Sequence, residues 1–167
     1  NLAAAWRWAL QQQDEAEIAS SAKPLALLLM RVNCAGLALE LLKTAINALM
    51  NAEQCAPLQL AYGHVLERCG QLQDASHAAQ QALHHYKEQP DAWPGTSEAA
   101  QIDALLLLAR CWMRIGDTDD ARGVLEQAQD MANTTTSRKL ADVLSNLGRV
   151  LLLTGDVGEA EAHFQRS

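Results

Sequence analysis

The sequence predicts an all-α fold, a solenoid of about four helical hairpins, and three observations support this prediction. Hydrophobic residues make up 49% of the 167 residues, and no long run of β-branched residues, which favour strands, occurs. Apolar residues recur at the three- and four-residue spacing of a helix face. A short pattern that begins with glycine occurs three times along the chain, and repeated hairpins bury their apolar faces by stacking on one another.

A short N-terminal helix is predicted over residues 1–13. Asn1 can cap its first turn. Trp8 lies off the apolar face of this helix, so we expect its indole ring to meet a neighbouring element. That apolar face is expected to comprise Leu2, Ala5, Trp6 and Ala9.

The first predicted hairpin spans residues 14–51. Asp14 can cap its first helix, which we expect to end at Asn33, because asparagine tolerates the left-handed conformation that terminates helices. Pro24 lies inside this helix and lacks a backbone donor, which predicts a kink or a break. The partner helix is expected over residues 36–50.

Three further hairpins are predicted, so that residues 14–167 form a single repeat domain. Residues 89–96, after the second hairpin, contain two prolines and a glycine and cannot continue a helix. Trp93 in this segment is expected to pack against the scaffold. The three hairpins are expected at residues 54–88, 97–132 and 137–167.

A six-residue pattern marks the turn of three hairpins. It begins with glycine and ends with alanine, and it occupies residues 70–75, 116–121 and 155–160. A small residue precedes each glycine by seven positions, and a large apolar residue precedes it by four. The glycine allows the first helix to end. The small residue allows two helices to approach closely, and the large residue fills the groove between them.

This pattern resembles the tetratricopeptide repeat, and the resemblance covers about residues 14–167. The signature positions of the third hairpin are occupied by Leu105, Leu108, Ala109, Trp112, Gly116, Ala121, Leu125 and Ala128. The second hairpin departs from the signature at Gln59 and Ala79, and Asn33 replaces the turn glycine of the first. The resemblance implies a right-handed α-α superhelix whose concave groove is lined mainly by the first helix of each hairpin.

The resemblance also assigns candidate partner-binding residues to this groove. They are Arg31, His64, Arg68, Arg110, Met113, Arg114 and Arg149, and Leu152 and Leu153 fall at groove positions of the last hairpin. A guanidinium group binds carboxylates and phosphates through paired hydrogen bonds, so we expect an acidic peptide, a terminal carboxylate or a small anionic ligand. In the alternative interpretation, the arginines pair with Glu67, Asp103 and Asp142 and only keep the groove soluble.

Composition and charge narrow the classes of function. The net charge of −7 argues against direct nucleic-acid binding, and the apolar runs are far shorter than the ~20 residues of a membrane span. No metal-ligand spacing, nucleotide motif or nucleophile–base arrangement is present, so we expect no metal, no cofactor and no enzymatic activity. The four cysteines lack a CxxC pair, which favours reduced thiols in a cytoplasmic protein.

The opening stretch, NLAAAWRWALQQQDEAEIA, resembles the start of the helical-repeat region of multidomain signalling ATPases and related bacterial transcriptional regulators. This resemblance implies a protein-interaction or ligand-sensing domain of a larger regulator, and we expect the chain to be a segment of a longer protein. A stand-alone adaptor that holds partners together is the alternative. In either case, the end helices of a solenoid expose apolar faces through which two copies could form a homodimer.

Overall fold

The computed structural model describes residues 2–12, 15–49, 55–88, 97–134 and 137–167, and these residues form nine α-helices and no strand. The predicted all-α fold is confirmed. The chain divides into two compact units, Asn1–Trp93 and Pro94–Ser167, each of which buries its own apolar residues. The expected packing of Trp93 and the expected caps at Asn1 and Asp14 lie outside the described residues.

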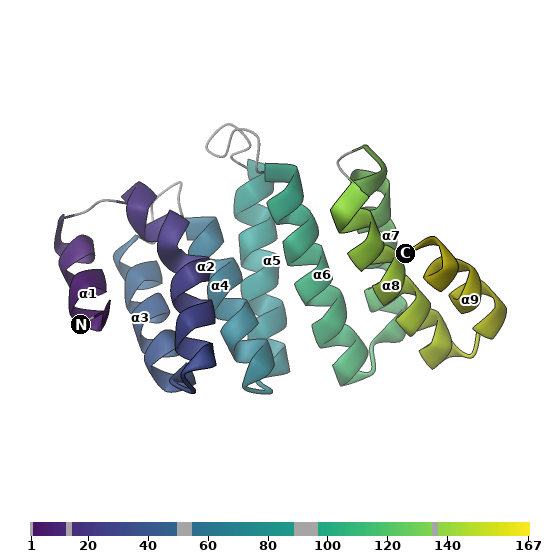
Figure 1. Cartoon of the computed structure of the whole chain (residues 1–167), viewed down its shortest axis with the longest axis horizontal. Helices are drawn as coiled ribbons and strands as arrows, with labels where there is room; N and C mark the ends of the chain where they lie inside the picture. The colour runs from purple at the N-terminus through teal and green to yellow at the C-terminus, as the bar shows by residue number, and fades with distance from the viewer. Residues whose placement is uncertain (1, 13–14, 50–54, 89–96, 135–136) are drawn as a thin grey trace. The chain divides into compact units, whose positions relative to one another are not determined.

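Unit 1 contains the first five helices, coloured purple to teal in Figure 1. They are α1 (Leu2–Gln12), α2 (Glu15–Arg31), α3 (Ala35–Ala48), α4 (Cys55–Arg68) and α5 (Leu72–Glu88). Helices α2 and α3 form one hairpin, and α4 and α5 form the next. Because α4 packs against both α2 and α3, the two hairpins stack and enclose a common core.

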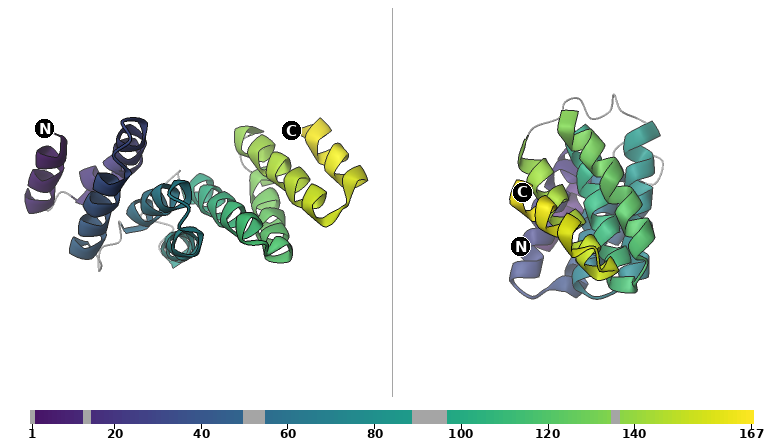
Figure 2. Two further views of the ribbon diagram at one scale, coloured as in Figure 1. Left: turned by 90° about the horizontal axis from the view of Figure 1, so that it is seen from below. Right: turned by 90° about the vertical axis from the view of Figure 1, so that its right-hand side faces the viewer.

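Unit 2 contains the remaining four helices: α6 (Ser97–Ile115), α7 (Thr118–Thr134), α8 (Ser137–Thr154) and α9 (Val157–Arg166). Two or three residues join the helices of each pair here and in unit 1, so the paired helices run antiparallel, as the two views of Figure 2 show. Helix α8 packs against both α6 and α7, which stacks the last hairpin on the one before it. The predicted architecture of about four helical hairpins is therefore confirmed, whereas a single repeat domain over residues 14–167 stays a prediction.

The turn of every hairpin is closed in the same way. The first helix is followed by a residue with positive φ, namely Asn33 (58°), Gly70 (81°), Gly116 (106°) or Gly155 (91°), so the predicted left-handed conformation of Asn33 is confirmed. The next amide donates a hydrogen bond of 2.8 to 3.0 Å to a carbonyl five positions earlier, at Leu29, Leu66, Trp112 or Leu151. This is the Schellman closure of a helix. The large residue of the sequence pattern therefore also accepts the bond that closes the turn.

The alanine at the end of each repeated pattern closes the first turn of the second helix. The amides of Ala75, Ala121 and Ala160 donate to the carbonyl of the residue that follows the glycine, at 2.9 to 3.0 Å. Their side chains are fully buried. The fixed spacing from glycine to alanine is therefore the first hydrogen-bonded turn of the second helix, and the side chain that closes this turn is a buried alanine.

Pro24 does not break α2, which runs as one helix from Glu15 to Arg31. Proline frees the carbonyl four residues earlier, which here belongs to Ser20. Both Pro24 and Ser20 are exposed, so solvent can satisfy that carbonyl without interrupting the helix. The predicted break of this helix at Pro24 is therefore wrong.

The two tryptophans of α1 behave differently from one another. Trp6 is buried, as predicted, and its Nε1 donates to the backbone carbonyl of Leu41 in α3 at 3.4 Å. Trp8 was expected to meet a neighbouring element, but its side chain is 63% exposed. Ala5, predicted on the apolar face, is also exposed. Trp6 is therefore the large side chain that anchors α1 against α3.

Candidate functional site

Three of the predicted groove residues lie in unit 1. Arg31 is the last residue of α2 and Arg68 the last residue of α4, and both side chains are exposed. His64 lies one helical turn before Arg68 and is half-buried. Within the described residues, neither Arg31 nor Arg68 forms a hydrogen bond or an ion pair.

The other four predicted residues lie in unit 2, on α6 and α8. Arg110 and Met113 are half-buried on α6, whereas Arg114 on α6 and Arg149 on α8 are exposed. The two helices run in the same direction (Figure 1) and pack against one another. The seven predicted residues thus divide into two sets, and a single groove that contains them all remains a prediction.

An ion pair shows which faces of α6 and α8 meet. Lys139 of α8 donates to the carboxylate of Asp103 on α6. Arg110 lies seven residues after Asp103, so these two side chains share a helix face. Arg149 lies ten residues after Lys139, which places it about 80° around α8 from that lysine. Asp103 was predicted to pair with the groove arginines, and Lys139 is a partner that the sequence analysis did not name.

Apolar side chains continue the same surface of α8. Leu152 is 50% exposed and Leu153 is 61% exposed, and they follow Arg149 by three and four positions, which is the spacing of one helix face. We call the two stripes of these residues, one on α6 and one on α8, the α6–α8 face. It comprises Arg110, Met113, Arg114, Arg149, Leu152 and Leu153. The face is both basic and apolar.

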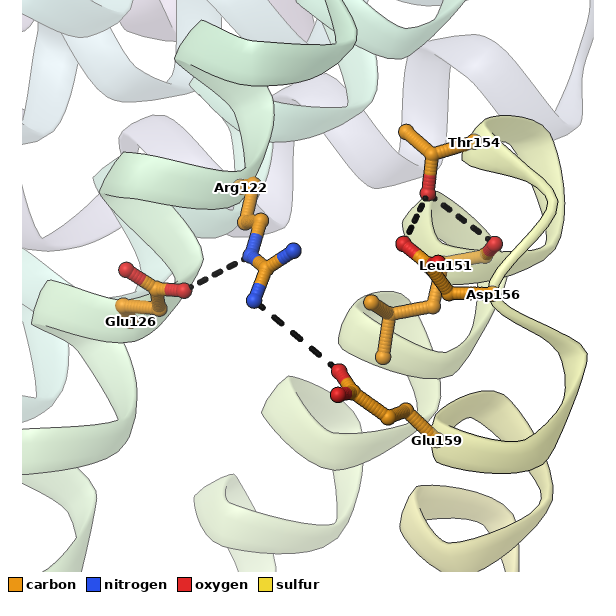
Figure 3. A network of polar contacts seen from close by, with 6 residues as sticks. All are labelled: Arg122, Glu126, Leu151, Thr154, Asp156 and Glu159. Atoms are coloured by element: carbon orange, nitrogen blue, oxygen red, sulfur yellow. Dashed lines mark hydrogen bonds and ion pairs between the residues drawn. The ribbon is translucent and has the colours of Figure 1, made fainter.

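Another arginine of unit 2 has a structural role instead. Arg122 of α7 donates through Nε to Glu126 at 2.8 Å, and its Nη2 lies 3.9 Å from Glu159 of α9 (Figure 3). The hydrogen bond and charge of Glu126 raise the pKa of the Arg122 guanidinium further above its usual range. Arg122 therefore links the two hairpins of unit 2 by exposed ion pairs and serves as a matched control for the α6–α8 face.

A pocket that sequence reasoning missed lies in unit 1. Its volume is about 470 Å³, and α3, α4 and α5 each contribute three side chains at helical spacing. The lining residues are Lys43, Ile46, Asn47, Cys55, Gln59, Tyr62, Gln81, His84 and His85. One signal was present in the sequence, because Gln59 departs from the apolar residue found at the equivalent position of the later hairpins.

The described residues do not form a metal site. Within them, no group of three or more His, Cys, Asp or Glu side chains is placed to hold an ion. All four cysteines are free thiols. Burial raises the pKa of Cys55, an effect partly offset by its hydrogen bond with Gln59, so this thiol is a poor nucleophile and a poor metal ligand. None of the helices in the described ranges combines the length and apolarity that crossing a membrane requires.

Known proteins share this architecture. The family model described as tetratricopeptide repeat matches residues 100–167. BtubC from P. vanneervenii is 21% identical to the chain, with a TM-score of 0.78 over 96% of this chain and 68% of BtubC. The apo form of RapI is 16% identical, with a TM-score of 0.79 over 98% of this chain and 60% of RapI, so the chain spans less than two thirds of that protein.

A third similar structure carries the repeat in its description. A putative kinesin light chain from Podospora anserina with nearly identical TPR-like repeats is 18% identical, with a TM-score of 0.72 over 98% of this chain and 90% of that one. Comparison with curated protein sequences finds no match. The chain therefore has the fold of tetratricopeptide-repeat structures, and its residues 100–167 match the model of that family.

Proposed function

We propose that this chain is a non-catalytic protein-interaction domain whose α6–α8 face binds an acidic, partly apolar peptide segment of a partner protein. Tetratricopeptide-repeat folds suggest protein–protein interaction, because stacked hairpins present extended surfaces with little chemistry of their own. The proposal narrows this general class to one surface and one kind of partner.

The observation that carries the proposal is the combination of Arg149 with Leu152 and Leu153 on one exposed stripe of α8. Exposed leucines lose contact with water when a partner covers them, which contributes about 25 cal/mol per Å² of apolar area. Arg149 forms no hydrogen bond or ion pair with any other described residue, so its guanidinium is available to a carboxylate. Arg110 and Arg114 on α6 extend the positive charge across the face.

The net charge of the chain supports an acidic partner. The whole chain carries −7, so an acidic peptide is repelled by most of the surface and attracted to the few arginine-rich regions. This uneven electrostatic potential directs an acidic peptide to one docking site and orients it as the two molecules approach. A terminal carboxylate or a small anionic ligand is a weaker candidate for this face, because neither would cover the two leucines.

We further propose that the domain belongs to a larger bacterial signalling or transcriptional regulator in the cytoplasm. The opening stretch NLAAAWRWALQQQDEAEIA supports this context through its resemblance to the repeat regions of such regulators. Two of the four free thiols, Cys34 and Cys69, are exposed, which suits a reducing compartment.

The test is the binding of a fluorescently labelled synthetic peptide of alternating Glu and Leu to the full chain, measured by fluorescence anisotropy. We expect the double variant Arg110→Ala/Arg114→Ala and the variant Arg149→Ala each to weaken binding by about fivefold or more, since a charge-assisted hydrogen bond at a partly exposed site contributes about 1 kcal/mol. Leu152→Ser/Leu153→Ser should weaken binding to a similar degree.

Arg122→Ala is the matched control, because it removes the same charge from unit 2 away from the α6–α8 face. A second control peptide carries Lys in place of Glu and should not bind. Equal weakening by Arg122→Ala and Arg149→Ala would show that only net charge matters and would refute the proposed site. Self-association of the wild-type chain that disappears in the Leu152→Ser/Leu153→Ser variant would instead assign the face to a homodimer.

A further inference from the structure

The pocket of unit 1 is built from residues that the proposed peptide-binding face does not use. Lys43, Ile46 and Asn47 come from α3; Cys55, Gln59 and Tyr62 from α4; and Gln81, His84 and His85 from α5. All of these belong to unit 1, whereas the α6–α8 face belongs to unit 2. A ligand of this pocket is therefore a question separate from the peptide partner.

The pocket coincides with a departure from the repeat pattern within this chain. Leu105 and Leu144 occupy the signature position in the third and fourth hairpins that Gln59 occupies in the second. Both leucines are at most 1% exposed, whereas Gln59 is half-buried and lines the pocket. A position that elsewhere fills the core therefore holds a polar side chain here, beside an open cavity. A half-buried amide at this position gives up the apolar burial that a leucine would provide.

The lining of the pocket favours an anion. Lys43 contributes a positive charge, and no aspartate or glutamate is among the nine lining residues, although the chain carries −7 overall. Asn47, Gln59 and Gln81 offer amide N–H donors, and Tyr62 offers a hydroxyl. The imidazole rings of His84 and His85 lie 6.0 Å apart between centroids and are tilted by 53°, and each ring carries at least one N–H donor.

The charge of the lining places the acidic group of a ligand against Lys43, the cationic side chain among the nine lining residues. Burial, followed by the nearby charge of Asp74, raises the pKa of Tyr62, so its hydroxyl keeps the proton that it can donate. A metal ion is a poor alternative, because no group of three ligating side chains is suitably placed among the described residues.

We propose that this pocket binds a small organic anion, a carboxylate or a phosphate monoester with a polar body. Lys43 pairs with the acidic group, His84 and His85 donate to it, and the amides of Asn47, Gln59 and Gln81 hydrogen-bond the polar body, with Ile46 as the apolar wall. The volume of about 470 Å³ falls in the range of about 300–1,000 Å³ that is typical of small-molecule sites.

The test is isothermal titration calorimetry of the full chain with three probes: citrate for a carboxylate ligand, glucose 6-phosphate for a phosphate monoester, and glucose as the neutral control. We expect heat of binding with at least one of the two anions and none with glucose. The anion that binds identifies which acidic group the pocket takes.

Two variants locate the binding. Lys43→Gln should weaken anion binding by about tenfold, the effect of losing a charge-assisted partner, whereas Lys87→Gln should leave it unchanged. Lys87 is the matched control, since it is exposed on α5 outside the pocket. Gln59→Leu restores the residue type of the later hairpins and removes one amide from the lining, so it should fold and weaken binding without lowering the melting temperature.

Three results would overturn the proposal: no heat with either anion, equal binding of glucose, or equal weakening by Lys87→Gln and Lys43→Gln. The peptide experiment on the α6–α8 face remains independent. Lys43→Gln should not change peptide affinity, and Arg149→Ala should not change anion affinity.

Discussion

The aromatic ring of Phe164 in α9 occupies the space where Gly148 in α8 would otherwise carry a side chain. A Cβ added to Gly148 would lie 2.7 Å from both Cε1 and Cζ of the ring, closer than atoms can approach. Gly148 is one of the small residues that precede the turn glycine by seven positions. Its predicted task, to allow two helices to approach closely, is performed here by admitting one aromatic ring.

This relationship predicts a measurable coupling between the two residues. Alanine in place of glycine stabilises a helix interior by about 0.5–1 kcal/mol. We expect Gly148→Ala to show that gain in a Phe164→Ala background and to lose it when the ring is present, because the ring must move. Urea denaturation of the four members of this double-mutant cycle measures the coupling.

Gly123 in α7 provides the control for this cycle, since a Cβ there would meet nothing within 4 Å. Gly123→Ala should stabilise the chain equally with and without Phe164. If Gly148→Ala were equally stabilising in both backgrounds, the proposed steric role of Gly148 would be wrong.

The anchoring of α1 by Trp6 predicts that the two tryptophans differ sharply in their contribution to stability. Trp6→Ala should lower the free energy of unfolding of unit 1 by about 3–5 kcal/mol, the usual cost of deleting a buried aromatic side chain. Trp8→Ala should change it by less than about 0.5 kcal/mol, because Trp8 is mostly exposed. Chemical denaturation followed by circular dichroism compares the two, and similar losses would contradict the assigned anchor.

The backbone conformation of Gly116 predicts that asparagine cannot fully replace glycine at this turn. Gly116 has a φ of 106°, whereas Asn33 has a φ of 58° at the equivalent turn of the first hairpin. The value at Asn33 lies in the left-handed region that asparagine tolerates, but that of Gly116 lies outside it. Gly116→Ala should cost about 1–2 kcal/mol, and Gly116→Asn should recover only part of that loss. Thermal melts of both variants decide the point, and an unchanged melting temperature in Gly116→Ala would contradict it.

The burial of Cys55 predicts that unit 1 loses stability in alkaline solution. Burial raises the pKa of this thiol above its ordinary value of 9.0, so the unfolded chain releases the proton at a lower pH than the folded chain. The stability associated with the neutral thiol is fully present below pH 9.0 and is lost as the pH rises through the higher folded-state pKa. Tyr62, whose pKa is also raised, contributes in the same direction at higher pH.

Urea denaturation at a series of pH values from neutral to strongly alkaline measures this loss. Cys55→Ala should flatten the first part of the decline, and Tyr62→Phe the later part, whatever either substitution does to stability at neutral pH. The control is Cys34→Ala, since Cys34 is exposed. A decline that Cys55→Ala leaves unchanged would assign the alkaline sensitivity to other groups.

The fold could be predicted from the sequence because its signals are local. Helix faces, turn residues and the spacing from glycine to alanine each depend on a few neighbouring residues, and the Schellman closures at Leu66, Trp112 and Leu151 follow directly from that spacing. Pro24 was misjudged because proline's effect on a helix depends on whether solvent reaches the freed carbonyl. That is a property of the folded surface and not of the local sequence.

The candidate sites could be predicted only in part. The helix register places Arg110, Arg114 and Arg149 on particular faces of their helices. The Lys139–Asp103 ion pair between α8 and α6 joins residues far apart in the chain, so it could not be predicted in the same way. The same holds for the pocket, whose nine lining residues come from three helices. The sequence shows that Gln59 departs from the repeat pattern. Whether this side chain lines a pocket depends on the residues of α3 and α5 that surround it.

The sequence by itself determined the class of fold, the positions of the hairpins and the residue that closes each turn, because helical periodicity and backbone freedom act over a few residues. Only the tertiary structure decided that Gly148 admits Phe164, that Trp6 and not Trp8 anchors α1, and that α3, α4 and α5 leave a polar pocket between them. These features depend on which side chains from distant segments share the same space, and packing of that kind is settled only when the helices stack.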